Sequence, residues 1–130
     1  MLLDTSGLLC LHHAQSDLHT LAVERFEHAV RRVTHNYVLA EFVALVHARK
    51  IPRRQALCYI VELADNPVVE VFWVTAAMHR AGLDLLKRRP DKSYSLCDAV
   101  SFLVMEDLGI TDALTTDRHF EQEGYVRLLK

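Results

Sequence analysis

Four acidic residues stand beside or within apolar segments of the chain: Asp4, Glu41, Asp98 and Asp117. A lone buried carboxylate is costly, so an interior acid is paired, hydrogen-bonded, protonated or bound to a cation. Mg²⁺ and Mn²⁺ are hard cations that take oxygen ligands. Two such ions about 4 Å apart hold a phosphodiester and activate the attacking water. If the four acids meet in the folded protein, they therefore indicate metal-assisted hydrolysis of phosphodiester bonds.

Three of these acids also have a purely structural explanation. Asp4 follows the apolar run 1–3 and is either a helix N-cap or a ligand at the end of a buried strand. Asp98 comes three residues after Ser95, which is the spacing of a capping box. Asp117 precedes a predicted helical turn that it can cap. The sequence leaves both explanations open for each of them.

Glu41 is harder to explain by local structure. Its neighbours one turn away on the predicted helix are Tyr37, Val38, Ala44 and Leu45, all of them largely apolar. An acid on this face either needs a partner in the core or lies half-exposed at the edge of the apolar face. The pattern is compatible with both.

The elements that must position these acids are short strands alternating with helices. Strands are predicted at 1–3, 33–35, 68–74, 113–115 and 125–129, and helices at 6–13, 18–31, 37–49, 52–65, 75–88, 95–109 and 119–123. The segment VVEVFWV at 68–74 has the clearest strand character, and the nearly all-apolar segment 95–109 predicts a buried helix. This alternation is typical of a parallel sheet with helices on both faces. The strands then end together, so the four acids are expected at the carboxyl end of the sheet.

The bulk composition is that of one globular domain spanning residues 1–130. The chain is 51% apolar and 25% charged, which is ordinary for a compact protein. No apolar run is long enough for a membrane span, and the first residues lack the basic region of a secretory signal. We interpret Cys10, Cys58 and Cys97 as reduced thiols in the core of a cytoplasmic protein.

The distribution of charge bears on the class of partner. A formal net charge of −2 argues against a general polyanion binder. Basic residues nevertheless cluster at 31–32, 49–54 and 87–92. Each cluster is explained equally well by the end of a helix, where it favours the macrodipole, or by contact with nucleic acid.

Motifs of several other enzyme classes are absent from the sequence. There is no glycine-rich phosphate loop and no GxSxG segment. The eight histidines show neither an HExxH motif nor paired Cys and His spacing, which argues against zinc.

The order of these residues resembles the PIN-domain family, and most closely the VapC-type toxins of toxin–antitoxin pairs. The matching segments are LLDTSGLL at the start, THNYVLAEF in the first third and SLCDAVSFLVMEDLGITDALTTDRHF near the end. The resemblance implies a three-layer α/β/α fold with a short central parallel sheet. It also implies that the four acids bind Mg²⁺ or Mn²⁺ and that Thr115 accompanies them as a catalytic residue.

The same resemblance implies an endoribonuclease that leaves a 5′-phosphate and a 3′-hydroxyl. It further implies a homodimer inhibited by a cognate antitoxin protein. Beside the acids, Thr5, Ser6 and Arg118 are candidate contacts to the RNA substrate. Asp112 is an additional acid before the strand at 113–115, and we do not count it as a ligand. The alternative is a PIN-fold module that binds RNA or protein without cutting, although crowded carboxylates would repel phosphate.

Overall fold

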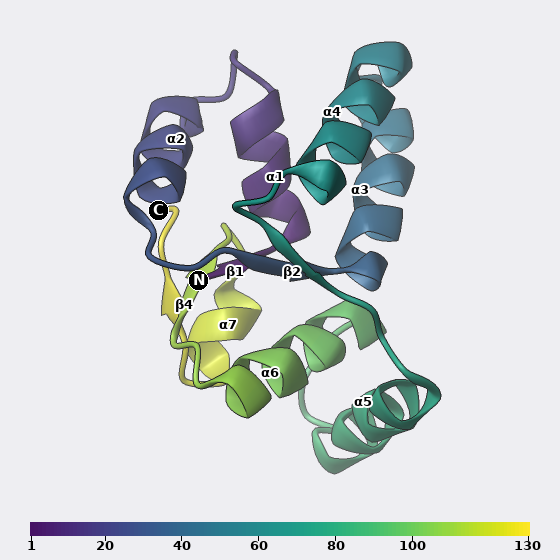
Figure 1. The fold of residues 1–130 in the computed structure, drawn as a ribbon. Coiled ribbons are helices and arrows are strands. Elements are labelled where there is room, and N and C mark those ends of the chain that lie inside the picture. The colour runs from purple at the N-terminus through teal and green to yellow at the C-terminus, as the bar shows by residue number, and fades with distance from the viewer.

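The computed structural model describes all residues from 1 to 130, with strands and helices alternating along the chain (Figure 1). The strands are β1 (Leu2–Leu3), β2 (Val33–His35), β3 (Glu70–Phe72), β4 (Asp112–Leu114) and β5 (Val126–Arg127). The helices are α1 (Thr5–His12), α2 (His19–His28), α3 (Asn36–Ala48), α4 (Arg53–Asp65), α5 (Ala76–Arg88), α6 (Leu96–Leu108) and α7 (Arg118–Gln122).

The strands form one parallel sheet in the order β3-β2-β1-β4-β5. Helices α1 to α4 cover one face of the sheet, and α5 to α7 lie on the other (Figure 1). This arrangement confirms the predicted three-layer α/β/α fold with a short central parallel sheet. The central strand β1 therefore ends inside the protein, with helices on both sides.

The two residues of β1 explain why the sheet is buried on both faces. Successive side chains of a strand point to opposite faces. Leu3 packs in the core beneath α1 and α3, whereas Leu2 packs in the core beneath α6, and neither is exposed. Each leucine of the opening segment thus anchors one of the two apolar layers.

Gly7 allows helix α1 to lie directly against strand β4. A Cβ atom at this position would stand 2.0 Å from the carbonyl oxygen of Leu114, far inside contact distance. The backbone N–H of Asp4 donates to the same oxygen at 3.2 Å. The glycine in LLDTSGLL is therefore required for the close approach that brings the ends of β1 and β4 together.

The segment 68–74 forms a shorter strand than its sequence predicts. Only Glu70–Phe72 pairs, and it does so with β2 on one side alone, because β3 is the edge strand. Asn66 turns the chain before it, with its side chain accepting from the N–H of Val68 at 3.1 Å. Trp73 is 68% exposed. The apolar run reflects surface-facing apolar residues as well as sheet pairing, so the prediction was wrong in extent.

Two other predictions were wrong, and both concern the face of the sheet covered by α1 to α4. Helix α2 ends at His28 rather than at 31, because Arg32 turns back to donate to the carbonyls of Phe26 and Glu27. Cys58 lies on the solvent side of α4 and is exposed, so it is not a core thiol, whereas the other two cysteines are buried. All three cysteines are free. No helix of the chain has the length and apolar character needed to cross a bilayer.

Candidate functional site

The four predicted acids come from four different elements that meet at the carboxyl end of the sheet. Asp4 follows β1, Glu41 lies in α3 after β2, Asp98 is in the first turn of α6, and Asp117 precedes α7 after β4. Asp4, Glu41 and Asp117 lie where the chain passes from a strand to a helix, which is where parallel sheets place their sites, whereas Asp98 opens a helix that follows another helix. The positions thus follow from the topology.

Asp4 is the deepest of the acids, with 5% of its surface exposed. It occupies the N-cap position of α1, yet its side chain makes no capping hydrogen bond. The carboxylate instead accepts from the hydroxyl of Thr115 at 2.7 Å. The pKa of Asp4 is raised to about 6. Burial is the main cause and the charges of Asp98 and Glu41 add to it, whereas the Thr115 hydrogen bond acts in the opposite direction. The side chain of Asp4 therefore belongs to the acidic site rather than to a helix cap.

Two hydroxyl residues connect Asp4 to the loop after β4. Ser6 Oγ lies 3.2 Å from Asp4 Oδ2 and 3.0 Å from Thr115 Oγ1. It also accepts from the backbone N–H of Thr116 at 2.9 Å, while Thr115 Oγ1 accepts from the N–H of Asp117 at 3.0 Å. This network fixes the carboxylate of Asp4 relative to the backbone that leads to Asp117.

Asp98 has both roles that the sequence left open. It forms the predicted capping box with Ser95, through two hydrogen bonds of 2.9 and 3.0 Å. Its Oδ2 atom also lies 2.9 Å from Nδ1 of His119, whose ring is 3.4 Å from Oδ2 of Asp117. Donor atoms of these three residues lie within 4.8 Å of one another. Asp117 likewise caps its helix, accepting from the N–H of His119 at 2.9 Å.

His119 is the residue that sequence reasoning missed. Because a carboxylate oxygen can only accept, the Nδ1–H group of His119 donates to Asp98. On the other side of the ring, Nε2 lies 3.2 Å from the hydroxyl of Ser93, and the Tyr94 ring packs edge-on at 5.2 Å. The signal was available in the segment TTDRHF, where a histidine follows an acid by two residues on a short helical turn.

Glu41 is half-buried and has neither a hydrogen bond nor an ion pair from its side chain. Its proximity to the site is indicated by its effect on the pKa of a neighbouring side chain. Burial raises the pKa of the Cys97 thiol, and the charges of Glu41, Asp4 and Asp98 raise it further, in that order. The charges of three of the four acids therefore reach Cys97. Asp98 and Asp117 meet at His119, whereas Asp4 and Glu41 lie outside that close group, so the convergence of all four acids stays a prediction.

The three candidate substrate contacts differ in their exposure. Ser6 is half-buried and belongs to the network around Asp4. Thr5 is 1% exposed, and its hydroxyl has no hydrogen-bond partner, so its side chain does not reach the surface. Arg118 is exposed on α7 and has no ion pair, which leaves its guanidinium group available. Of the three, Arg118 is the freest to meet a ligand.

The donor set fits a divalent cation that prefers oxygen. No lysine or arginine pairs with any of the four acids, and His119 is the one basic side chain in contact with them, shared by Asp98 and Asp117. Asp4 is buried among like charges without compensation. The hard oxygen ligands favour Mg²⁺ or Mn²⁺ over softer ions. His119 holds Asp98 and Asp117 together through its Nδ1 atom.

Comparison with known proteins agrees with this geometry. The model of the PIN domain family matches residues 1–123. The 23S rRNA-specific endonuclease VapC20 of Mycobacterium tuberculosis is 33% identical over 96 residues, which cover 74% of this chain and 72% of that protein. The crystal structure of M. tuberculosis VapC20, described as a sarcin-ricin loop cleaving toxin, superposes with a TM-score of 0.89 at 29% identity. That match covers 99% of this chain and 98% of the other.

Proposed function

This chain belongs to the PIN domain family, and on that basis we propose that it is a divalent-metal-dependent endoribonuclease, the toxin of a toxin–antitoxin pair. In this proposal residues 1–130 act as one nuclease domain. The ion is Mg²⁺ or Mn²⁺, and its ligands are Asp4, Glu41, Asp98 and Asp117. Thr115 is a catalytic residue beside them.

The observation that carries the proposal is the group of four acids with no arginine or lysine partner. A protein that only bound RNA would gain nothing from this arrangement, because carboxylates repel phosphate. Structural acids are normally neutralised where they are buried. Asp4 is neither exposed nor paired, and its elevated pKa reflects that deficit. A bound cation supplies the missing positive charge.

The residues of the chain hold the ligands in place before any cation arrives. Thr115 and Ser6 orient the carboxylate of Asp4. The capping box with Ser95 fixes Asp98 through its Oδ2 atom. A divalent ion bound by these residues would stabilise charge on the phosphodiester oxygens and would activate a water for attack on phosphorus. Since the ligands are already ordered, little reorganisation accompanies binding.

The identity of the relatives suggests the substrate and the partners. We propose ribosomal RNA as the first substrate to test, because the relative matched over most of both chains acts on 23S rRNA. Such a substrate places the activity in the cytoplasm. We also propose a cognate antitoxin protein and a homodimeric state. Arg118, exposed beside Asp117, is a candidate contact to a substrate phosphate.

Cleavage of purified bacterial ribosomes tests the proposal. The purified chain is incubated with them in Mg²⁺, in Mn²⁺ and in chelator, and 23S rRNA products are mapped by primer extension. We expect discrete cuts that require the metal and disappear in the Asp98→Asn variant. Equal cleavage by that variant would mean a contaminating nuclease.

A negative result is also informative if metal binding is measured in parallel. Calorimetry with Mn²⁺ should give binding to the wild-type chain and much weaker binding to Asp98→Asn. If Mn²⁺ does not bind and no RNA is cut, the non-catalytic binding module becomes the better description. The RNA would then be expected to bind without products.

A further inference from the structure

A groove of about 410 Å³ extends from the acidic site along one side of α1. Ser6, Cys10 and His13 follow one another at helical spacing and line it from the side of α1. Ser6 and Thr116 stand at the end nearest the acids, since Ser6 contacts Asp4. The rise of the helix puts His13 about 10 Å further along.

The far part of the groove is formed by the residues that follow α3. Helices α1 and α3 pack together, and both begin at the carboxyl end of the sheet. Arg49 and Lys50, at the end of α3, line the groove together with His13. None of the residues that line it is acidic. The groove is therefore basic, although Ser6 at its near end contacts the carboxylate of Asp4.

The side chains of Arg49 and Lys50 are exposed and make no ion pair or hydrogen bond. One arginine in each of the other two predicted clusters is engaged: Arg31 pairs with Glu70, and Arg89 pairs with Glu123. The cluster at 49–50 is thus a pair of free cations at one groove. Free cations on a groove that leads to a phosphodiester-cleaving site match the charge of a nucleic-acid backbone.

The backbone of Lys50 gives a second, independent observation. Its φ angle is 56°, in the left-handed region that favours glycine, and no other non-glycine residue of the chain has a positive φ. The chain does use glycine where α6 ends in the same way, at Gly109 with φ 65°. Lysine therefore occupies a backbone position at some cost in stability, where α6 uses glycine.

We propose that this groove holds the backbone of the RNA strand beside the bond that is cut, with Arg49 and Lys50 binding a phosphate more than one nucleotide away from it. The inference rests on the proposed function and names the path of the substrate at the same site. A single strand fits the arrangement, because unpaired RNA presents its phosphates along one edge to a narrow basic channel.

Binding of a short fluorescein-labelled single-stranded RNA of mixed sequence tests the inference. Fluorescence anisotropy is measured in chelator, which prevents cleavage, over a range of KCl concentrations. Loss of one phosphate contact should weaken binding by about tenfold at low salt and lower the slope of log K against log[salt] by about 0.7. We expect this for Arg49→Gln and for Lys50→Gly.

Lys50→Gly separates the two roles of this position. Relief of the left-handed backbone should raise its Tm by about 3 °C while RNA binding falls. The control is Lys87→Gln, which removes an exposed, unpaired cation on α5, on the other face of the sheet. That variant should bind RNA as the wild type does.

Three outcomes would overturn the inference. The first is wild-type RNA affinity and salt slope in both groove variants. The second is an equal loss in Lys87→Gln, which would reduce the effect to net charge. The third is unchanged RNA binding together with weaker capture of a co-expressed partner protein, which would assign the groove to that protein. Failure of the wild-type chain to cut any RNA would instead refute the proposed function.

Discussion

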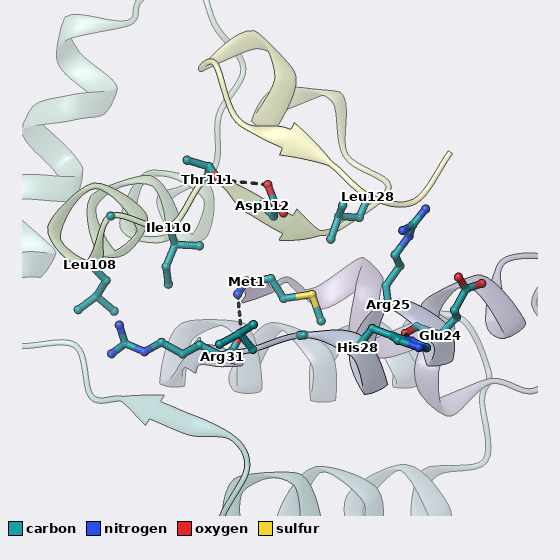
Figure 2. Close-up of a pocket in the computed structure, with 13 residues that line it drawn as sticks. Met1, Glu24, Arg25, His28, Arg31, Leu108, Ile110, Thr111, Asp112 and Leu128 are labelled. Atoms are coloured by element: carbon teal, nitrogen blue, oxygen red, sulfur yellow. Dashed lines mark hydrogen bonds between the residues drawn. The ribbon is translucent and has the colours of Figure 1, made fainter.

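Both ends of the sheet carry charged groups, but the two ends differ in which charges have partners of opposite sign. At the carboxyl end, Asp4, Asp98 and Asp117 are crowded together with Glu41, and no arginine or lysine compensates them. At the amino end, the chain surrounds a larger cavity of about 680 Å³ (Figure 2). Acidic and basic residues both line that cavity, so it does not collect acids alone.

The amino-end cavity lies where β1 and β4 begin, between α2 and the turn after α6 (Figure 2). Met1 donates its amino group to the carbonyl of Arg31, and the Arg31 side chain pairs with Glu70. Asp112 accepts from the hydroxyl of Thr111. Residues of both signs line the cavity, and the ion pair of Arg31 with Glu70 is about half-exposed.

The comparison shows that volume does not locate the site in this protein. A large cavity with balanced charges needs no ligand to satisfy it. Acids without a lysine or arginine partner do need one, because like charges held together destabilise the folded chain until a cation arrives. Unbalanced charge is therefore the better guide to chemistry here.

The sharpest way to break this comparison is to remove one acid from each end. Asp98→Asn should reduce RNA cleavage by about 10³-fold or more, because a metal ligand is lost. Asp112→Asn should leave cleavage within about twofold, since that acid only accepts from its neighbour. Primer extension on 23S rRNA at equal protein concentrations measures both. Comparable losses in the two variants would remove the distinction between the ends.

A second test concerns the histidine at each end. His119→Phe keeps the ring against Tyr94 but removes the donor to Asp98, and should weaken Mn²⁺ binding by about 10- to 100-fold. His119→Asn keeps a donor near Nδ1 and should recover part of that loss. His28→Asn, beside the amino-end cavity, is the control.

Titration calorimetry gives the Mn²⁺ affinities of these variants. Excess Mn²⁺ should restore cleavage in His119→Phe, because the histidine positions a ligand. If saturating metal fails to restore cleavage, His119 has a role in the reaction itself.

The stability of the metal-free protein should report the unbalanced charge directly. Because the pKa of Asp4 is raised from 3.8 to about 6, its ionisation costs stability as the pH rises from about 4 to about 6. At pH 7 the full cost is about 3 kcal/mol, as an upper estimate. In chelator, Asp4→Asn should therefore melt about 5 °C above the wild type at pH 7.5 and equal it near pH 4.

The quantity to measure is the difference in Tm between the wild type and Asp4→Asn. The reason is that His35 changes the stability of both proteins with pH in the opposite direction. Burial lowers the pKa of His35 to about 4, so the folded chain loses stability as the pH falls from about 6.5 towards 4. This effect is common to both proteins and cancels. Added Mn²⁺ should raise the Tm of the wild type but not that of Asp4→Asn. A metal-free variant less stable than the wild type at pH 7.5 would contradict the prediction.

The smallest effect is expected at the amino end. Arg31→Gln removes an ion pair whose side chains are 47% and 54% exposed. Such pairs are weak in water, so the free energy of unfolding should change by about 0.5 kcal/mol or less, and less still in high salt. RNA cleavage should be unchanged. Urea unfolding at two salt concentrations measures the change in the free energy of unfolding. A loss above about 2 kcal/mol would show that the amino end of the sheet also depends on its charges for stability.

Much of the fold was predictable because its signals are local. The alternation of short apolar strands with helices depends on periodicity within a few residues, and it correctly predicts a parallel sheet with two helical layers. The capping box of Ser95 and Asp98 spans a single turn and forms as expected. Three of the acids were identified from their positions after strands and Asp98 from its place at the start of a buried helix, and their ligand roles remain a prediction.

Other features depended on segments distant in the sequence. The exposure of Cys58 and the short pairing of 68–74 depend on which elements cover them. The sequence also could not decide whether each basic cluster lies at the end of a helix or contacts nucleic acid. Arg31 forms an ion pair with Glu70, which lies 39 residues away in the sequence, whereas Arg49 forms no ion pair.

The sequence by itself determined the order of the elements and the residue types at their ends, because these follow from backbone geometry and hydrogen bonds within one turn. Tertiary structure alone decided the charge environment of each acid. Asp4 reaches Thr115 across 111 positions, and Asp98 reaches His119 across 21. Burial and Coulomb interactions depend on distance in space, and that distance is set only when α1, α3, α6 and α7 pack around the end of the sheet.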